Sequence, residues 1–563
     1  MSAILLLGML FAQDLDVALN PMSKRGGTIL DQVEDPTERR AFLDLYNDSD
    51  PLSRRSRVSD FVKRFSSSWL LAQVHEAGAL ASFELGDIPT GLFHARLSLE
   101  LYPENAALHS TLAAVYSNRG ERPLAQEHAR SALVYLERFV APSNMTERSW
   151  NPIRERLRQT AVRILSAAGE APVIRPKDPD SAYAGSESCR SCHPSQFAAW
   201  AQTGMARMLR KATEQTVVGD FETDGYFQSG LLLARPGRTG RSLFFDLRGS
   251  TGEWSRYLVE YVVGSKWQQA YAARAANGEL HVLPIQYNLL EKSWINYWRM
   301  IDPPGSERAE ISTFHRFREF TSYQKNCAPC HTSQMTTASF REAGVNCEMC
   351  HGPGSAHVNG KPQKWSFQGI GNAQYVEVCA QCHAQSAIRE PQGFPPRYKR
   401  RPYTEFSRKA FYRDGRFRET TFIVEAFERS ACFRKGQAHC GSCHNPHPED
   451  AAANPTSLRF RDDPNRMCLQ CHEERYRGNS HTRHASGDAT LCVSCHMPKI
   501  MNSLLFRART HQIDDRPNAQ MTIRFGASES PNACLECHAD RDAHWTQNQL
   551  LTWSGKARTE RSR

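Results

Sequence analysis

Apolar and polar residues between positions 70 and 140 alternate with a period typical of amphipathic helices, and this pattern occurs twice. Shifting the chain by 34 residues superimposes His75 on His109 and Gly86 on Gly120, together with the Pro three residues after each glycine. Small residues recur where the predicted helices would cross. The pattern predicts two consecutive helix-turn-helix units.

A period of 34 residues resembles the tetratricopeptide repeat, in which pairs of helices stack side by side. We predict that residues 13–170 form a helical repeat domain, clearest at 70–140, with flanking helices near 35–66 and 147–168 as partial repeats or caps. Stacked repeats present a concave surface, so they are expected to dock a partner protein or a second copy; a purely structural cap is the alternative. The repeat histidines are expected to pack between helices or lie on the surface.

The rest of the chain shows three other patterns. A Pro-rich linker is predicted at 171–185. Three segments, RSLFFDLRG, WSRYLVEYVVG and ELHVLPIQYNLL, alternate apolar and polar positions between turn residues, which predicts a small antiparallel β insertion at about 217–290. From 305 onward the pattern predicts short helices and long loops, and residues 556–563 form a basic tail. The predicted fold is therefore mainly α.

A short apolar run lies at the start of the chain, from Ala3 to Ala12. It predicts a signal peptide over residues 1–12 with Ala12 as the cleavage point, although the usual basic segment before the run is absent. An apolar first helix is the alternative interpretation. No other run approaches the 18 apolar residues that a transmembrane helix needs, so no integral membrane span is expected.

Sixteen of the 17 cysteines fall into pairs with two residues between them, and a histidine follows every pair. CxxCH is the attachment signature of c-type haem, in which two thioethers hold the porphyrin and the histidine binds the iron. Zinc ribbons also use CxxC pairs, but neither they nor disulfides need the next residue to be His eight times. We therefore predict eight covalently bound haems. The motifs are Cys189/Cys192/His193, Cys327/Cys330/His331, Cys347/Cys350/His351, Cys379/Cys382/His383, Cys440/Cys443/His444, Cys468/Cys471/His472, Cys492/Cys495/His496 and Cys534/Cys537/His538.

Eight haems change how the other properties of the chain are interpreted. Porphyrins would supply most of the buried apolar surface of a cytochrome domain at 186–555, so this domain should not fold without haem. The formal charge of +10 would otherwise favour nucleic acid as a partner, but the haem propionates offset it, and no nucleic-acid partner is expected. Covalent haem attachment takes place outside the cytoplasm, which predicts a periplasmic or otherwise extracytoplasmic protein.

Candidate ligands for the second face of each iron are the histidines outside the motifs, thirteen of the 21 in the chain. Setting aside the repeat histidines leaves nine for eight irons, which predicts that most haems are bound by two histidines. Two candidates follow a motif histidine so closely that each is expected to bind a neighbouring haem instead. Met205, on a predicted helix after the first motif, is a further candidate, with core packing as the alternative. The predicted histidine ligands are His315, His357, His447, His481, His484 and His511, whereas His281, His439 and His544 are expected to be polar loop residues.

Cys432 is the one cysteine outside the motifs. An inert, buried thiol is the expected role; a reactive thiol, a haem ligand and an intermolecular bridge are the alternatives.

The segments CEMCHGPGSAHV, FRKGQAHCGSCHNPH and HASGDATLCVSCHMP resemble the multihaem cytochromes c related to pentahaem nitrite reductase, octahaem hydroxylamine oxidoreductase and their tetrahaem electron-transfer relatives. The resemblance covers residues 320–540 and, loosely, 185–200. It implies haems stacked in parallel and perpendicular pairs that form a continuous path for electrons. The chain departs from the catalytic members because all eight motifs end in His rather than Lys, and no tyrosine, Tyr476 included, can be assigned as a haem cross-link.

The leading hypothesis is an exported octahaem cytochrome that relays electrons between redox partners, such as other cytochromes or a membrane quinol oxidoreductase, with the repeats docking one of them. The alternative is an oxidoreductase that acts on a small nitrogen or sulfur compound, such as nitrite or hydroxylamine, at a haem with an open face. A third hypothesis treats the haems as structural parts of an assembly scaffold.

Overall fold

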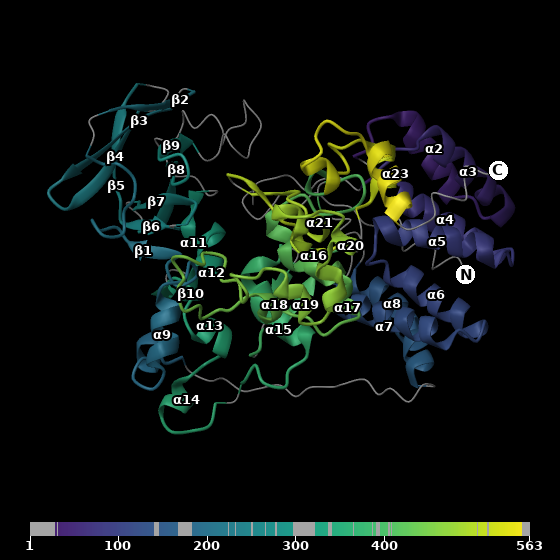
Figure 1. The fold of residues 1–563 in the computed structure, drawn as a ribbon, viewed down its shortest axis with the longest axis horizontal. Helices are drawn as coiled ribbons and strands as arrows, with labels where there is room; N and C mark the ends of the chain where they lie inside the picture. The colour runs from purple at the N-terminus through teal and green to yellow at the C-terminus, as the bar shows by residue number, and fades with distance from the viewer. Residues whose placement is uncertain are drawn as a thin grey trace.

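The computed structural model describes residues 29–553, except 31, 140–145, 167–182, 223–224, 231, 249–251, 265, 276–277, 297–320, 336–339, 364, 386, 390–393, 403–405, 407, 504 and 515–516. The predicted signal peptide, most of the predicted linker, His315 and the basic tail lie outside the described residues. Figure 1 shows three parts: a β unit at one end, N-terminal helices at the other, and the CxxCH segments between them. None of the helices in the described part combines the length and apolar character of a membrane span.

The N-terminal helices pack against one another in pairs, which confirms the helices predicted from the sequence pattern. The two 34-residue units are each a helix pair. Gly86 and Gly120 follow the first helix of each pair with φ of +78° and +76°, a conformation that glycine adopts readily. The helices are α2 (Pro36–Tyr46), α3 (Pro51–Arg64), α4 (Leu71–Glu84), α5 (Ile88–Leu101), α6 (Ala106–Asn118), α7 (Arg122–Arg138) and α8 (Glu147–Ser166).

Each helix pair holds a pair of histidines at equivalent positions, one of them buried and the other half-buried. The Nδ1 atoms of His75 and His94 lie 3.0 Å apart, and those of His109 and His128 lie 2.8 Å apart. His109 Nε2 also donates to the carbonyl of Pro103 at 2.9 Å. Direct nitrogen-nitrogen hydrogen bonds leave no room for an iron between the rings, so these histidines serve helix packing.

We expect the repeat helices to lose stability as the pH falls from 7 to 4.5. Burial lowers the pKa of His109 from 6.5 to about 3, so below pH 6.5 the unfolded chain binds a proton that the folded chain does not, and folding is penalised. Buried Glu76, whose pKa burial raises to about 7, acts with the opposite sign. When thermal unfolding is followed by far-UV circular dichroism, the melting temperature should fall less between pH 7 and pH 4.5 for His109→Gln than for the wild type. Equal pH slopes for wild type and variant would contradict the prediction.

The β unit is a two-layered sandwich of antiparallel strands, running from Leu209 to Asn296 and so extending beyond the predicted 217–290. Inward-facing residues such as Phe245, Tyr271 and Leu283 form its core. One sheet has the order β1-β6-β7-β8-β9 and the other β2-β3-β4-β5. The strands are β1 (Leu209–Lys211), β2 (Phe227–Ser229), β3 (Leu232–Thr239), β4 (Ser242–Arg248), β5 (Trp254–Leu258), β6 (Tyr261–Val263), β7 (Gln268–Arg274), β8 (Leu280–Asn288) and β9 (Ser293–Asn296).

The residues that carry the CxxCH motifs, 186–201 and 321–553, are called the cytochrome region below. This region consists of short helices, long loops and small β ribbons, as the sequence predicts. Most helices there have only one or two turns. They are α9 (Pro194–Ala201), α11 (Tyr323–Asn326), α12 (Ala328–His331), α13 (Glu348–His351), α14 (Ser355–Val358), α15 (Asn372–His383), α16 (Ile423–Arg429), α17 (Ala431–Arg434), α18 (Cys440–Cys443), α19 (Arg466–Leu469), α20 (Asn479–Thr482), α21 (Cys492–His496), α22 (Ala519–Phe525) and α23 (Ala543–Trp553). The ribbons pair β10 (Thr332–Met335) with β11 (Phe340–Ala343), β12 (Ala387–Arg389) with β13 (Tyr398–Arg400), and β14 (Met501–Asn502) with β15 (Arg507–Ala508).

The N-terminal helices dock on the cytochrome region of their own chain. Arg429 of α16 donates to both carboxylate oxygens of Glu104 at 2.6 and 2.9 Å, and both side chains are buried. A Cβ at Gly415 would lie 2.6 Å from the Leu101 carbonyl oxygen, so the two parts approach closely. Phe139, just after α7, packs in an aromatic cluster of the cytochrome region. Part of the repeat surface is therefore occupied within the chain.

Candidate haem sites

Each CxxCH motif folds as a helical turn. In six motifs the histidine N–H donates to the carbonyl of the first cysteine at 2.9 to 3.1 Å, and the other two motifs end helices α15 and α21. Positions i and i+3 or i+4 share one face of a helix, so both sulfurs and the imidazole point to the same side. This arrangement presents two thioether positions and an iron ligand to one porphyrin edge.

Three motif cysteines are more exposed than the others. Cys192, Cys471 and Cys537 are exposed, whereas the other thirteen motif cysteines are half-buried. Each of the three is the second cysteine of its motif, in the first, sixth and eighth motifs respectively. These motifs continue into exposed residues after their first cysteine, so the second sulfur does not lie against another segment of the chain. The exposed runs are 190–196, 470–474 and 536–537.

Exposure does not remove these cysteines from the candidate haem sites. In all three motifs the histidine N–H still donates to the carbonyl of the first cysteine at 2.9 Å, so Cys192, Cys471 and Cys537 keep the same helical turn as the buried motifs. Attachment of haem through these three sulfurs stays a prediction.

Five motif histidines have a second histidine ring at a nearly constant separation. The distances between ring centroids lie between 6.0 and 6.4 Å, and the angles between ring planes between 4° and 38°. The pairs are His193 with His357 (6.4 Å, 27°), His351 with His447 (6.0 Å, 24°), His444 with His511 (6.4 Å, 17°), His496 with His481 (6.2 Å, 4°) and His538 with His484 (6.2 Å, 38°).

That separation fits an iron between the rings. A metal-nitrogen bond of about 2 Å on each side, plus about 1 Å from each nitrogen to its ring centre, gives roughly 6 Å between centroids. The histidine pairs of the repeats provide a contrast, because their centroids lie only 5.2 and 5.0 Å apart and their nitrogens hydrogen-bond directly. The residues of the cytochrome region therefore fit haem with two histidine ligands.

Hydrogen bonds also orient these imidazoles for metal binding. In five of the ten rings Nδ1 faces a backbone carbonyl, and because a carbonyl only accepts, Nδ1 must carry the proton. The lone pair then lies on Nε2, where an iron would bind. The pairs are His357 with Lys361 (3.1 Å), His444 with Thr456 (2.9 Å), His484 with Thr482 (2.6 Å), His496 with Asp514 (2.6 Å) and His511 with Arg509 (3.2 Å).

Three motif histidines have no second histidine ring at this distance within the described part of the chain. Burial lowers the pKa of His331 to about 4, and the ring of Tyr323 lies 6.2 Å away. The ring of Tyr476 lies 6.4 Å from that of His472, at 82°. Burial also lowers the pKa of His383. His315, predicted as a ligand, lies outside the described residues.

The remaining candidates occupy different surroundings. His281 is buried, with Nδ1 2.9 Å from the hydroxyl of Thr321. The prediction of a loop position is wrong for His281, which lies in β8, because its segment joins the sheet. His439 stacks on Tyr375, with ring centroids 4.1 Å apart. The prediction of a loop position is also wrong for His544, which lies on helix α23. The ring that lies next to that of His193 belongs to His357. The role of Met205 as a haem ligand stays a prediction.

Neighbouring motifs bring their sulfurs close together in four pairs, in each of which one thiol shifts the pKa of the other. The pairs are Cys189 with Cys347, Cys330 with Cys382, Cys379 with Cys440, and Cys468 with Cys492, and these sulfurs stand for haem thioethers in the mature protein. Burial raises the pKa of half-buried Cys432, which lies near Cys471 and Cys443, and its role stays a prediction.

Two glutamines, which were not singled out from the sequence, join motifs in the same way. Gln381 donates to the carbonyl of Met349 at 2.7 Å, and Gln470 donates to that of Ser442 at 2.8 Å. Both glutamines precede the second cysteine of their motif, and both acceptors precede the second cysteine of the previous motif. The shared CxQCH pattern was the available signal. These bonds fix the third motif against the fourth and the fifth against the sixth.

Two protein-family models match parts of the chain. The model described as a doubled CXXCH motif matches residues 431–476, and the model described as cytochrome c554 and c-prime matches residues 293–352. No curated protein sequence matches significantly. The repeated motifs and these matches make the chain a multihaem c-type cytochrome that binds haem covalently.

Two solved structures are similar at low identity. The crystal structure of the outer cell wall cytochrome OcwA is 17% identical, with a TM-score of 0.44, over 66% of this chain and 86% of that chain. The Wolinella succinogenes octaheme sulfite reductase MccA, form II, is 16% identical, with a TM-score of 0.31, over 62% of this chain and 61% of that chain.

Proposed function

We propose that this multihaem c-type cytochrome carries eight haems and relays electrons between redox partners. The observation that carries the proposal is the set of five histidine pairs at 6.0 to 6.4 Å. Two histidines fill both axial positions of an iron, which leaves no site for a substrate and suits electron transfer. Haems are numbered 1 to 8 below in the chain order of their motifs.

The assigned distal ligands link neighbouring haems. His357 follows the motif of haem 3 and binds haem 1, whereas His447 follows the motif of haem 5 and binds haem 3. His511 binds haem 5, and His481 and His484, from one short loop, bind haems 7 and 8. Because a ligand from one haem segment binds the next haem, the relative positions of the haems are fixed by the chain itself.

Sulfur contacts, glutamine bonds and shared ligands together favour a continuous path. The sulfur contacts join haem 1 to 3, 2 to 4, 4 to 5 and 6 to 7. Gln381 adds the link from haem 3 to haem 4, and Gln470 adds the link from haem 5 to haem 6. The loop carrying His481 and His484 joins haem 7 to haem 8. Electrons would enter and leave at haem 1, beside the β unit, and haem 8, toward the N-terminal helices (Figure 1).

We expect His511→Ala to convert one haem from low spin to high spin while total haem stays constant. Haem 5 would lose its distal ligand and become five-coordinate or bind water. Electron paramagnetic resonance of the oxidised protein should lose about one haem's share of low-spin intensity. His439→Ala is the matched control, because His439 stacks on Tyr375 and is paired with no motif histidine. An unchanged spectrum for His511→Ala would contradict the ligand assignment.

A second candidate function is an oxidoreductase at a haem with one open face, acting on a small nitrogen or sulfur compound. It is favoured by the three motif histidines, His331, His383 and His472, that lack a second histidine within the described residues. Electron paramagnetic resonance spectra recorded before and after addition of nitrite, hydroxylamine or sulfite distinguish the two functions. Low-spin signals that integrate to eight haems and do not move support the relay, whereas a high-spin signal that shifts identifies an open iron.

The cellular setting forms part of the proposal. Covalent haem attachment places the protein in the periplasm or another extracytoplasmic compartment, reached through the signal peptide at residues 1–12. Redox partners are other cytochromes or a membrane quinol oxidoreductase. One of them docks on the repeat surface that the cytochrome region leaves open.

A further inference from the structure

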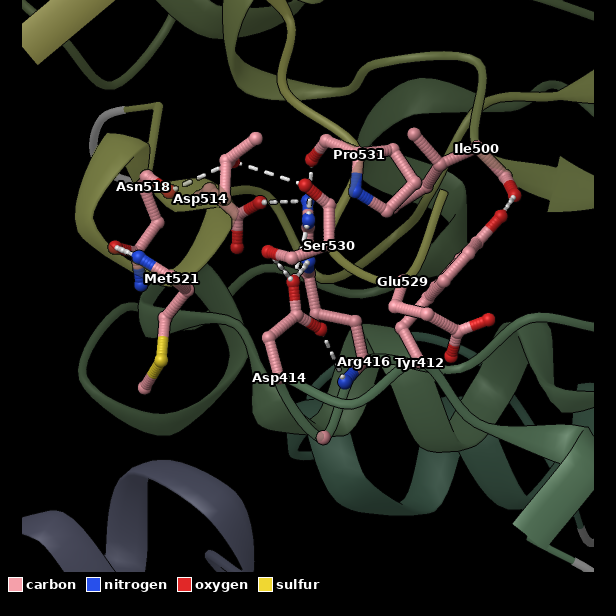
Figure 2. Close-up of polar contacts among 12 residues, drawn as sticks. Tyr412, Asp414, Arg416, Ile500, Asp514, Asn518, Met521, Glu529, Ser530 and Pro531 are labelled. Carbon is pink, nitrogen blue, oxygen red and sulfur yellow. Dashed lines mark hydrogen bonds and ion pairs between the residues drawn. The ribbon is translucent and has the colours of Figure 1, made fainter. Parts of the chain in front are cut away.

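A buried ionic cluster joins segments next to the motifs of haems 7 and 8, and no step of the relay described so far uses it (Figure 2). The guanidinium of Arg416 donates twice to one carboxylate oxygen of Asp414, at 2.9 and 2.6 Å, and once to Asp514, at 3.3 Å. It also donates to the carbonyl of Pro531, and the hydroxyl of Ser530 donates to Asp414 at 2.6 Å. Arg416 and Asp414 are each 7% exposed and Ser530 is fully buried.

One end of the cluster holds the proximal ligand of haem 7. The carbonyl of Asp514 accepts the hydrogen bond from His496 Nδ1 at 2.6 Å, and the N–H of Asp514 donates to the carbonyl of His496 at 3.0 Å. The Arg416 guanidinium therefore binds the side chain of the residue whose peptide group orients the imidazole. A partner that accepts from Nδ1 sets the orientation of a ligating histidine and its strength as a ligand.

The other end holds the segment that leads into haem 8. Arg416 binds Pro531, and the next residue, Asn532, accepts from the N–H of Cys534 at 2.9 Å. Cys534 is the first cysteine of the haem 8 motif. Three segments far apart in the sequence, 414–416, 514 and 530–532, thus meet at one guanidinium.

We propose that Arg416 is a positioning residue that sets the orientation of His496 and the placement of haem 8 relative to haem 7. Burying a guanidinium and a carboxylate costs desolvation energy, which directional bonds to several partners must offset. The planar fork of arginine fixes angles as well as distances, and a lysine ammonium does not. The proposal rests on the assignment of His496 and His481 to haem 7.

The ring planes of His481 and His496 make an angle of 4°, the smallest of the five pairs. Near-parallel imidazoles give a rhombic low-spin resonance signal, and a twist of one ring moves its g-values. The charge of Arg416 also stabilises the reduced form of nearby haems, so its removal beside two carboxylates lowers their reduction potentials. Geometry and charge therefore have separate readouts.

The test compares Arg416→Lys and Arg416→Gln with Arg418→Gln in the haem-loaded protein. Arg418 is a matched control because it lies two residues away and pairs with Glu529, next to Ser530, at 3.1 Å, yet is a quarter exposed. His481→Ala identifies the haem 7 signal by its loss. We expect Arg416→Lys to shift that signal with little change in potential. We expect Arg416→Gln to shift the signal and to lower the potentials of haems 7 and 8, and Arg418→Gln to do neither.

The outcomes distinguish a failure of the haem 7 ligand assignment from a failure of the positioning role of Arg416. If His481→Ala removes no rhombic signal, the ligand assignment fails. If it does, but both Arg416 variants match Arg418→Gln in spectrum and potentials, the positioning role is overturned. If Arg416→Gln loses haem, two milder variants replace it in the test: Arg416→Lys and Ser530→Ala. Ser530→Ala removes only the hydrogen bond from the Ser530 hydroxyl to Asp414. An unshifted haem 7 signal in both variants overturns the proposal.

Discussion

Produced without haem attachment, the chain is expected to lose nearly all folded structure in residues 186–555, apart from the β sandwich, while the helices over residues 36–166 persist. Hydrogen exchange followed by mass spectrometry resolves the two regions in one experiment. Amide protection in α15 and α21 should fall to that of an unfolded chain. The helices α4 to α7 should stay protected, weakened only where they contact the cytochrome region.

The physical reason is the length of the motif helices. Helices α12, α13, α18 and α19 have four residues each, and a helix of that length is unstable in water without tertiary contacts. Haem faces would supply those contacts, together with two covalent bonds to each motif. By contrast, the repeat helices of 13 to 17 residues bury alanine and leucine against one another. Full protection of α15 in the haem-free chain would contradict this account.

The sequence predicts the haem motifs well because their chemistry is local. Two thiols and an imidazole within five residues define an attachment site wherever the chain goes, and the 34-residue period predicts helix pairs for the same reason. The pairing of histidines is different, because it depends on tertiary contacts. The partner of His444 is His511, 67 residues later, and no spacing rule connects them.

How far each motif is buried cannot be predicted from the motif either. Cys192 and Cys537 have the same spacing to their histidines as the half-buried cysteines, yet both are exposed. What distinguishes them is whether another segment of the folded chain packs over the second sulfur, and a five-residue motif carries no information about that.

The same limit applies to the residues that support the ligands. Arg416 has no pattern that distinguishes it from the other arginines of the chain, and its contacts with Asp514 and Pro531 arise only after three segments fold together. His281 was expected to lie in a loop although the alternating segment ELHVLPIQYNLL includes it, and the structure pairs it into β8. Local chemistry is thus predictable, whereas the surroundings of each ligand follow from packing.

The position of the N-terminal helices bears on how a partner could use them. The repeats were expected to offer a docking surface, and α5 to α7 meet the cytochrome region through buried charges. A second ionic group, in which Arg138 and Arg400 bind Glu377 and Glu428, lies at the same contact. Glu377 belongs to α15, which carries the haem 4 motif. The repeat helices are therefore placed to stabilise the segment that carries the haem 4 motif, and a partner of the proposed relay would have to use their other faces.

Arg429→Ala is expected to destabilise this contact by about 3 to 5 kcal/mol, because it leaves the carboxylate of Glu104 buried without its partner. The side chains of Glu104 and Arg429 are only 3% and 5% exposed, so water cannot replace the lost charge. Urea unfolding of the haem-loaded protein, followed by far-UV circular dichroism, measures the change. Lys435→Ala is the matched control: its 3.2 Å pair with Glu127 joins the same two regions but is 63% and 44% exposed, so about 0 to 1 kcal/mol is expected.

A double variant, Glu104→Leu with Arg429→Met, separates the two contributions to that loss. Replacing both charges by apolar groups removes the desolvation cost along with the attraction, so most of the stability should return. If Arg429→Ala costs no more than Lys435→Ala, the buried pair does not hold the helices in place. If the double variant is as unstable as Arg429→Ala, shape and not charge determines the contact, and the close approach of Gly415 to Leu101 becomes the feature that joins the repeats to the haem region.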